Sequence, residues 1–140
     1  MKLIIDANIV FSAILNSKSK IADILIKSDS KYQFIAPEFL RHEIKSHYSK
    51  ISKISKYTFA EIAELEFQIC REINFISEDQ ISQKIWNQAY TIGHKIDEKD
   101  IVYIAFSKYF KCKIWTGDKK LINGLKKLGL SNFISTNELI

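Results

Sequence analysis

The stretch Lys2-Leu3-Ile4-Ile5-Asp6-Ala7-Asn8 decides the fold expected of this chain. Leu3, Ile4 and Ile5 form a short apolar run, which predicts a buried strand over residues 2–5 that ends at Asp6. Apolar residues then recur at helical spacing from residue 9 to residue 14. A buried strand that passes into a helix is the first unit expected of a parallel α/β sheet.

The same alternation continues to the end of the chain. Further strands are expected over 33–36, 74–76, 112–115 and 132–135, and helices over 21–27, 37–54, 58–71, 78–91, 101–106 and 119–127. Pro37 suits the first turn of its helix, Thr58 and Glu61 form a capping box, and Gly93 ends the helix before it. The sequence therefore predicts a three-layer α/β/α sandwich around a central parallel sheet of about four or five strands, as a single domain over residues 1–140.

The composition excludes several protein classes. With 140 residues, 46% of them hydrophobic, and only four glycines and one proline, the chain is neither collagen-like nor disordered. No apolar run approaches the roughly 20 residues that cross a bilayer, and the N-terminal stretch lacks a cleavage site for a signal peptide. Cys70 and Cys112 are too far apart for a C-x-x-C site and are expected to be buried thiols in a reducing compartment. We therefore expect a cytoplasmic protein that does not bind a membrane.

Basic residues outnumber acidic ones by 21 to 16, which gives a net charge of +5. This excess weakly favours a polyanionic partner such as nucleic acid. Two groups of lysines are either solvated surfaces or RNA contacts: Lys50, Lys53 and Lys56, and later Lys119, Lys120, Lys126 and Lys127. The three histidines, His42, His47 and His94, form no ligand set and are interpreted as surface or packing groups.

Several acidic residues stand beside strongly apolar segments, where an unpaired carboxylate is costly. Asp6 comes directly after the first predicted strand and Asp118 just after the strand that ends at Trp115, at the edge where a parallel sheet forms its binding crevice. Glu43 lies at the margin of a buried helix face, and Asp100 precedes the apolar helix 101–106 with Asp97 one turn before it.

Each acid also has an ordinary structural explanation. Asp6, Asp97, Asp100 and Asp118 occupy positions typical of helix caps or turns, and Glu43 is compatible with a solvated helix surface. Their joint pattern favours a cluster, in which carboxylates repel one another unless cations neutralise them. An all-oxygen set suits Mg²⁺ or Mn²⁺, and such ions can activate water for phosphodiester cleavage.

These elements together resemble the PIN-domain ribonucleases, similar to the VapC-type toxins of toxin–antitoxin pairs. The matching segments are Leu3–Asn8, Glu43-Ile44, Asp100–Ala105 and Ile114–Asp118, in an order that spans nearly the whole chain. The resemblance implies an α/β/α fold and divalent-metal-dependent cleavage of single-stranded RNA. It also implies a cognate antitoxin that occupies the acidic crevice, and a homodimer, for which an apolar helix surface around Phe59, Ile62 and Phe67 is a candidate.

The resemblance assigns roles to eight residues. Asp6, Glu43, Asp100 and Asp118 are the expected catalytic quartet, with Asp6, Asp100 and Asp118 as metal ligands and Glu43 binding metal or positioning the attacking water. Asn8 is expected to brace Asp6, Thr116 to orient the last carboxylate or a phosphate oxygen, and Asp97 to be an additional acid. Lys120 stands where many members have a further acid, which puts a second metal in doubt and makes this lysine a candidate phosphate contact.

Two other functions fit the same pattern. The chain is also compatible with a non-catalytic RNA- or protein-binding module that keeps the fold, which Lys120 favours slightly. A metal-dependent phosphatase or receiver-like phosphoacceptor domain also places aspartates at strand ends, but it matches the Asp6-x-Asn8 opening less well.

Overall fold

The computed structural model describes residues 1–27 and 31–140. One wholly parallel sheet of five strands crosses its middle, in the order β3-β2-β1-β4-β5. The strands are β1 (Lys2–Ile5), β2 (Gln33–Pro37), β3 (Ile73–Ile76), β4 (Lys113–Trp115) and β5 (Phe133–Ile134). The five strands predicted from the sequence are therefore confirmed.

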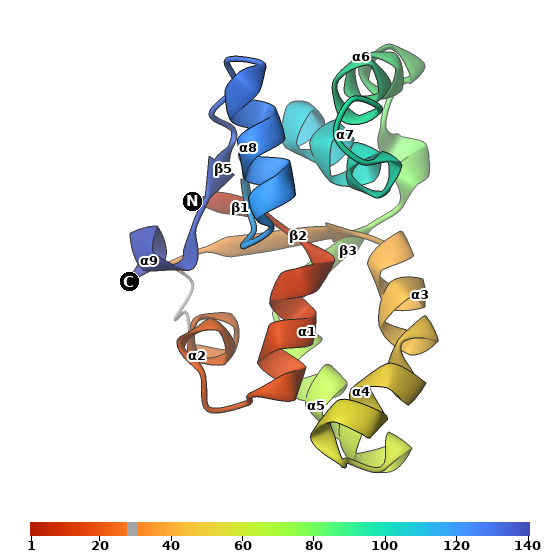
Figure 1. Ribbon diagram of the computed structural model, residues 1–140, viewed down its shortest axis with the longest axis vertical. Helices are drawn as coiled ribbons and strands as arrows, with labels where there is room; N and C mark the ends of the chain where they lie inside the picture. Colours follow the sequence, from red (N-terminus) through yellow and green to blue (C-terminus); the bar gives the residue numbers. More distant parts are fainter. Residues whose placement is uncertain (28–30) are drawn as a thin grey trace.

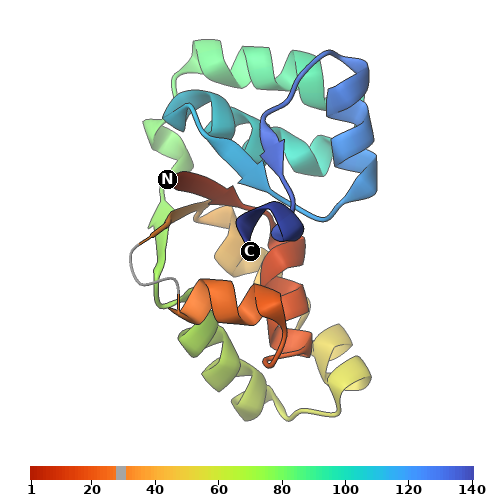
Figure 2. The same cartoon turned by 90° about the vertical axis from the view of Figure 1, so that its left-hand side faces the viewer.

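Helices cover both faces of this sheet (Figures 1 and 2). One side carries α6 (Gln83–Gly93), α7 (Ile101–Phe110) and α8 (Lys119–Lys127). The other carries α1 (Ala7–Leu15), α2 (Lys20–Lys27), α3 (Phe39–Ser46), α4 (Tyr48–Ser55) and α5 (Phe59–Cys70). Short turns of helix are η1 (Glu78–Gln80), η2 (Glu98–Asp100) and α9 (Thr136–Leu139). The predicted α/β/α sandwich is confirmed.

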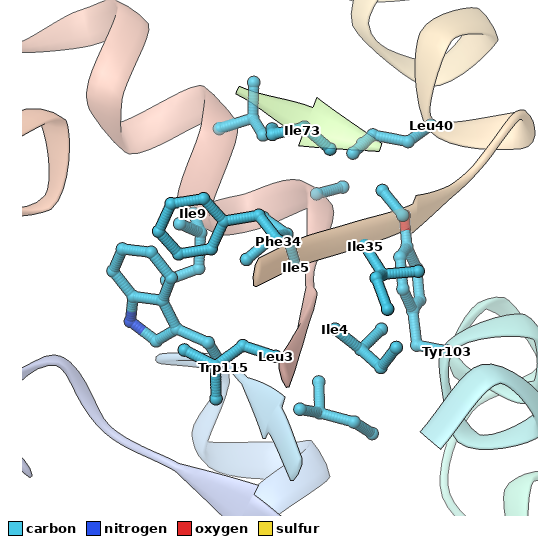
Figure 3. Packing of buried hydrophobic residues seen from close by; sticks show 14 of the residues in the cluster. Leu3, Ile4, Ile5, Ile9, Phe34, Ile35, Leu40, Ile73, Tyr103 and Trp115 are labelled. Atoms are coloured by element: carbon cyan, nitrogen blue, oxygen red, sulfur yellow. The ribbon is translucent and has the colours of Figure 1, made fainter. Parts of the chain in front are cut away.

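The core lies between the layers and is centred on β1 (Figure 3). Leu3, Ile4 and Ile5 are all completely buried, as expected for a central parallel strand with helices on both faces. Trp115 on β4 is also fully buried, and its indole Nε1 donates a hydrogen bond to Thr136 Oγ1 at 3.0 Å. This tryptophan belongs to the core and does not offer a surface for stacking.

The single helix expected over 37–54 is wrong. Pro37 is the last residue of β2, paired with Ile76, and the helical region is broken at His47 into α3 and α4. The His47 ring caps the break, because its Nδ1 lies 2.7 Å from the carbonyl oxygen of Glu43, which the end of α3 leaves without a helical partner. A single helix over 37–54 would also turn Ile54 toward the core, but Ile54 is 60% exposed.

The helix expected over 78–91 likewise differs. A separate turn, η1, precedes α6, which begins after Ser82 and ends at Gly93. The expected helix end at Gly93 is confirmed. A Cβ atom at Gly93 would lie 2.5 Å from Ile101 Cγ1, so this glycine allows α6 and α7 to approach closely. The capping box of Thr58 and Glu61 is confirmed at the start of α5.

Two further expectations concern Ser28 and membrane-spanning helices. The inward position expected for Ser28, at the end of the second helix, lies outside the described residues. Across residues 1–27 and 31–140, each helix is too short or too polar to span a lipid bilayer.

Candidate active site

The strand order locates the crevice in which a ligand is expected. From β1 the chain moves through β2 and β3 to one edge, then crosses back to β4 and β5 on the other side of β1. The order therefore reverses between β1 and β4, and open parallel sheets bind ligands beyond the carboxyl ends of such strands. Ile5 pairs with Trp115 at these ends, so Asp6 and Thr116 follow side by side.

Asp6 is held at this point by Thr116. The carboxylate is only 4% exposed, and the fully buried Thr116 hydroxyl donates a 2.6 Å hydrogen bond to its Oδ2. The same hydroxyl oxygen accepts the main-chain N–H of Asp118 at 3.0 Å, which ties the β4 loop to the first aspartate. Asp6 stands at the N-cap position of α1 but makes no capping hydrogen bond through its side chain, so capping does not explain the burial of its carboxylate.

The bracing expected of Asn8 comes from Thr116 instead. Asn8 is exposed, and its side chain makes no hydrogen bond to Asp6 among the described residues. The Thr116 hydroxyl thus orients the Asp6 carboxylate, and it contacts Asp118 only through the main-chain N–H of that residue.

Glu43 reaches the site from the helices on the α1 side of the sheet. It lies on α3, which follows β2, and its Oε1 accepts a 2.8 Å hydrogen bond from the Tyr103 hydroxyl of α7. Tyr103 is 2% exposed and belongs to the buried core (Figure 3). Tyr103 is not among the site residues that the sequence predicts, because a tyrosine inside an apolar helix is typical of core packing. Its sequence position carries no sign of a partner 60 residues away.

The remaining predicted acids lie at the starts of two helices. Asp100 is 7% exposed and makes no capping hydrogen bond, whereas Asp97 accepts the N–H of Lys99 at 3.0 Å. Asp118 does cap α8, since its Oδ1 accepts the N–H of Lys120 at 2.9 Å. Its Oδ2 has no hydrogen-bond partner in the described part of the chain, which leaves one oxygen available to a ligand.

Lys120 does not reach into the carboxylates. Its Nζ forms a 3.5 Å ion pair with Asp97 Oδ2, and both side chains are exposed, at 66% and 37%. This exposed pair is worth little in stability but places one positive charge at the rim of the acidic crevice.

The carboxylates act on one another electrostatically. Burial first, and then the charges of Asp6, Asp118 and Asp97, raise the pKa of Asp100 to about 7 against the opposing charge of Lys120. Burial also raises the pKa of Asp6, which the Thr116 hydrogen bond opposes and the Asp118 and Glu43 charges reinforce. The predicted quartet therefore shares one region of negative potential.

That region has the chemistry of a site for a hard cation, although its ligands are not gathered as a finished coordination sphere. Among the described residues, no three His, Cys, Asp or Glu side chains form a ready-made group around one ion. The donors are all oxygens, and two of the carboxylates are buried. Burial first and neighbouring carboxylates second raise the pKa of Asp6 and of Asp100, so keeping both ionised is costly without a cation. A divalent cation bound by oxygen ligands fits this donor set.

Comparison with known proteins agrees with this geometry. A model of the PIN-domain family matches residues 4–137. The chain belongs to the PIN-domain family. PIN domains are generally nucleases that use divalent metal.

Solved structures extend the comparison to the fold. This PIN domain is similar to a chain in the crystal structure of VapBC2 from Rickettsia felis bound to a DNA fragment from their promoter, with a TM-score of 0.67. The match covers 96% of this chain and 98% of that chain at 13% sequence identity, so it supports a shared fold. No curated protein sequence matches significantly.

Proposed function

We propose that this PIN domain is a divalent-metal-dependent endoribonuclease that hydrolyses phosphodiester bonds of single-stranded RNA, with Mg²⁺ or Mn²⁺ as its cofactor. The observation that carries the proposal is the burial of the Asp6 and Asp100 carboxylates, together with the Thr116 hydroxyl that joins Asp6 to the main chain of Asp118 at the β1/β4 switch point. Coupled, buried carboxylates are costly to maintain without a cation, whereas a nuclease requires them.

Asp6, Asp100 and Asp118 would hold the metal. When bound, the ion supplies an activated water and stabilises the leaving oxygen of the phosphodiester. Thr116 fixes the orientation of Asp6 through its 2.6 Å hydrogen bond, so this ligand needs little rearrangement. The Oδ2 of Asp118 is free of hydrogen bonds within the described residues and faces no competing donor there.

Glu43 would position the attacking water and take its proton. The Tyr103 hydroxyl holds one carboxylate oxygen and leaves the other for the water. Lys120, at the rim, would contact a substrate phosphate. Its ammonium group is exposed and would exchange its ion pair with Asp97 for one with the phosphate.

The biological role we propose is that of the toxin in a toxin–antitoxin pair, with a cognate antitoxin as partner. The similarity in fold to a chain of the VapBC2 structure supports this role. An antitoxin that inserts a basic side chain into the acidic crevice would neutralise Asp6 and Asp100 in place of metal, which accounts for inhibition by simple electrostatics.

A non-catalytic RNA- or protein-binding module is the second candidate function. The ion pair between Lys120 and Asp97 favours it, because this lysine supplies a positive charge where many relatives have a further acid. A module of this kind would bind RNA equally well with and without metal and would never cut it.

Metal removal separates the two functions. Incubation with an unstructured RNA and millimolar Mg²⁺ or Mn²⁺ should yield cleavage products, and excess EDTA should abolish them, because the carboxylates then have no cation to bridge to phosphate. Restoring Mn²⁺ in excess over the chelator should restore cleavage in the same sample. Undiminished cleavage in excess EDTA would refute the proposed function.

Replacing Tyr103 with phenylalanine tests the role of Glu43. Loss of the hydroxyl frees the carboxylate to rotate, and we expect kcat to fall about tenfold with KM unchanged, as for other groups that orient a catalytic ligand. Tyr109→Phe is the matched control on the same helix, since Tyr109 is 38% exposed. Equal rates for both variants would show that the Tyr103 hydroxyl does not position Glu43 for catalysis.

The surface proposed for the homodimer contains fewer residues than the sequence predicts. Ile62 is fully buried and cannot take part, but Phe59 and Phe67 on α5 are 54% and 63% exposed. We expect size-exclusion chromatography to show twice the 16.3 kDa chain mass at high concentration, and Phe67→Lys to shift the protein to monomer. Tyr90→Lys, at an exposed aromatic on α6, should not do so. A strict monomer at all concentrations would contradict the dimer.

A further inference from the structure

A pocket lined by aromatic side chains lies where α6 meets the starts of α3 and α7. Its aromatic members are Phe39, the first residue of α3, and Trp86 and Tyr90 on α6. Ile101 and Val102, at the start of α7, add apolar surface. The volume of about 600 Å³ lies within the range of about 300–1,000 Å³ typical of ligand pockets. No member of the predicted quartet lines this pocket, so it is separate from the candidate active site.

The rings of this pocket are left uncovered by the fold. Trp86 and Tyr90 are one turn apart on α6 and therefore share a face of that helix. Phe39 and Tyr90 are exposed and Trp86 is half-buried. The His94 ring stacks on Tyr90, with centroids 5.0 Å apart and planes 11° apart, which limits the rotation of the Tyr90 ring. Exposed aromatic side chains gathered around one pocket indicate a binding surface.

Two carboxylates belong to the same pocket. Glu78 begins η1 and Glu98 begins η2. The Oε2 of Glu78 accepts the main-chain N–H of Phe39 at 3.2 Å, which holds this carboxylate next to the aromatic lining. Within residues 1–27 and 31–140, neither glutamate forms an ion pair. Lys99 also lines the pocket, so its charged side chains sum to −1, in a chain whose net charge is +5.

Aromatic rings beside unpaired carboxylates suit a guanidinium group. The arginine side chain stacks its planar, weakly hydrated cation on aromatic faces and donates paired hydrogen bonds to a carboxylate. A lysine ammonium is more strongly hydrated and gains less from the rings. An RNA strand would bring its phosphates against the two glutamates, so like-charge repulsion disfavours RNA in this pocket.

The chain already holds one of its own arginines in this way. The guanidinium of Arg41 lies 3.8 Å from the centroid of the Phe75 ring, and its Nε is 3.6 Å from Glu38 Oε2. A ring and a carboxylate thus hold one arginine from opposite groups of the same fold. The pocket at Trp86 offers the same two groups with no arginine of this chain among its lining residues.

We propose that this pocket binds an arginine side chain presented by a protein partner. The guanidinium lies against the rings of Trp86 and Tyr90 and pairs with Glu78 or Glu98, while apolar side chains that flank the arginine cover Phe39. A protein segment fits better than a free polyamine, because a polyamine has no apolar side chains to cover this surface. The inference does not depend on the proposed nuclease function, since the pocket and the predicted quartet share no residue.

The test is titration of the whole chain with a blocked tripeptide, leucine-arginine-leucine, followed by tryptophan fluorescence. The chain has two tryptophans, and Trp115 is fully buried, so a change in emission on adding peptide reports on Trp86. The same peptide with citrulline in place of arginine keeps the shape and loses the charge. We expect it to bind about fivefold more weakly, the worth of one cation–π contact. The lysine peptide should bind with intermediate affinity.

Removing the carboxylates tests the charge of the pocket. Glu78→Gln combined with Glu98→Gln should weaken binding of the arginine peptide about tenfold, because both ion-pair partners are lost. The fold should survive, since the amide oxygen introduced at position 78 can still accept the Phe39 N–H. Glu72→Gln, at an exposed acid outside the pocket, is the control and should bind as the wild type does.

Two further variants test the location of the peptide. Tyr90→Ala should weaken binding about fivefold, whereas Tyr109→Ala, at an exposed aromatic on α7 outside the pocket, should not. Asp6→Asn removes a charge from the candidate active site and should leave the affinity for the arginine peptide unchanged.

Equal affinities for the arginine and citrulline peptides, or no binding up to millimolar peptide, would overturn the proposal. Weaker binding in Asp6→Asn but not in the double glutamate variant would place the arginine at the active-site carboxylates and would also overturn it. Quenching of Trp86 by single-stranded oligouridylate that the double variant strengthens would assign the pocket to RNA instead. Absence of metal-dependent cleavage would overturn the nuclease function and leave the arginine site standing.

Discussion

Replacing Asp6 with asparagine should lower RNA cleavage by at least about a thousandfold, because it removes the charge of the central metal ligand. A bound ion supplies several kcal/mol of transition-state stabilisation, and each 1.4 kcal/mol is roughly tenfold in rate. The measurement is kcat/KM on unstructured RNA at saturating Mn²⁺.

The fold should survive this change. Asparagine has nearly the same shape, and its amide oxygen can still accept the Thr116 hydroxyl that holds Asp6. Because burial and the Asp118 and Glu43 charges raise the pKa of Asp6, removing its charge should leave the metal-free Tm at pH 8 equal or higher. Asp23→Asn, at an exposed residue paired with Lys27 on α2, is the control and should keep full activity. More than a tenth of wild-type activity in Asp6→Asn would show that another group carries the metal.

Asp100 should make the metal-free protein less stable as pH rises. Its folded pKa is raised to about 7 from an ordinary value of 3.8, first by burial and then by the neighbouring carboxylates. A raised folded pKa means that the stabilising contribution is complete below about pH 4, is lost between about pH 4 and pH 7, and stays lost above that.

Asp100→Asn cannot ionise and should escape this loss. At pH 8, without metal, we expect the variant to be more stable than the wild type by about 1–2 kcal/mol, after discounting the full shift for partial solvent screening. The two proteins should converge near pH 4 in urea unfolding. Asp97→Asn is the control three residues earlier; the pKa of Asp97 is lowered by the Lys99 N–H, so this variant should not gain stability at pH 8. Parallel pH profiles for wild type and Asp100→Asn would contradict the account.

The parts of the site that follow strands could be predicted from sequence alone. Asp6 and Asp118 come at the ends of apolar runs, and a parallel sheet necessarily brings such ends to one edge. The pairing of Ile5 with Trp115 then brings Asp6 next to the loop that carries Asp118.

Side-chain partners from separate helices could not be predicted in this way. Tyr103 matches the apolar pattern of α7, and only the packing of α7 against α3 reveals that its hydroxyl holds Glu43. The burial of Thr116 and its choice of Asp6 over Asp118 likewise depend on rotamer and register, which sequence spacing does not determine.

The break at His47 was missed for a different reason. The apolar stripe continues on both sides of it, so periodicity alone favours one helix over 37–54. The sequence places His47 among surface or packing groups, whereas its side chain ends α3 by capping the Glu43 carbonyl. A histidine at a helix end, four residues after an acid, is the local signal that was available.

The most direct measurement is the position of a metal in crystals of this protein soaked in MnCl₂. Anomalous scattering at the manganese edge should show an ion within about 2.2 Å of carboxylate oxygens from Asp6 and at least one of Asp100 and Asp118. The peak should vanish in Asp6→Asn crystals soaked identically. An ion bound elsewhere, or these three carboxylates remaining apart with no ion between them under saturating Mn²⁺, would contradict the proposal that they form one metal-binding pocket.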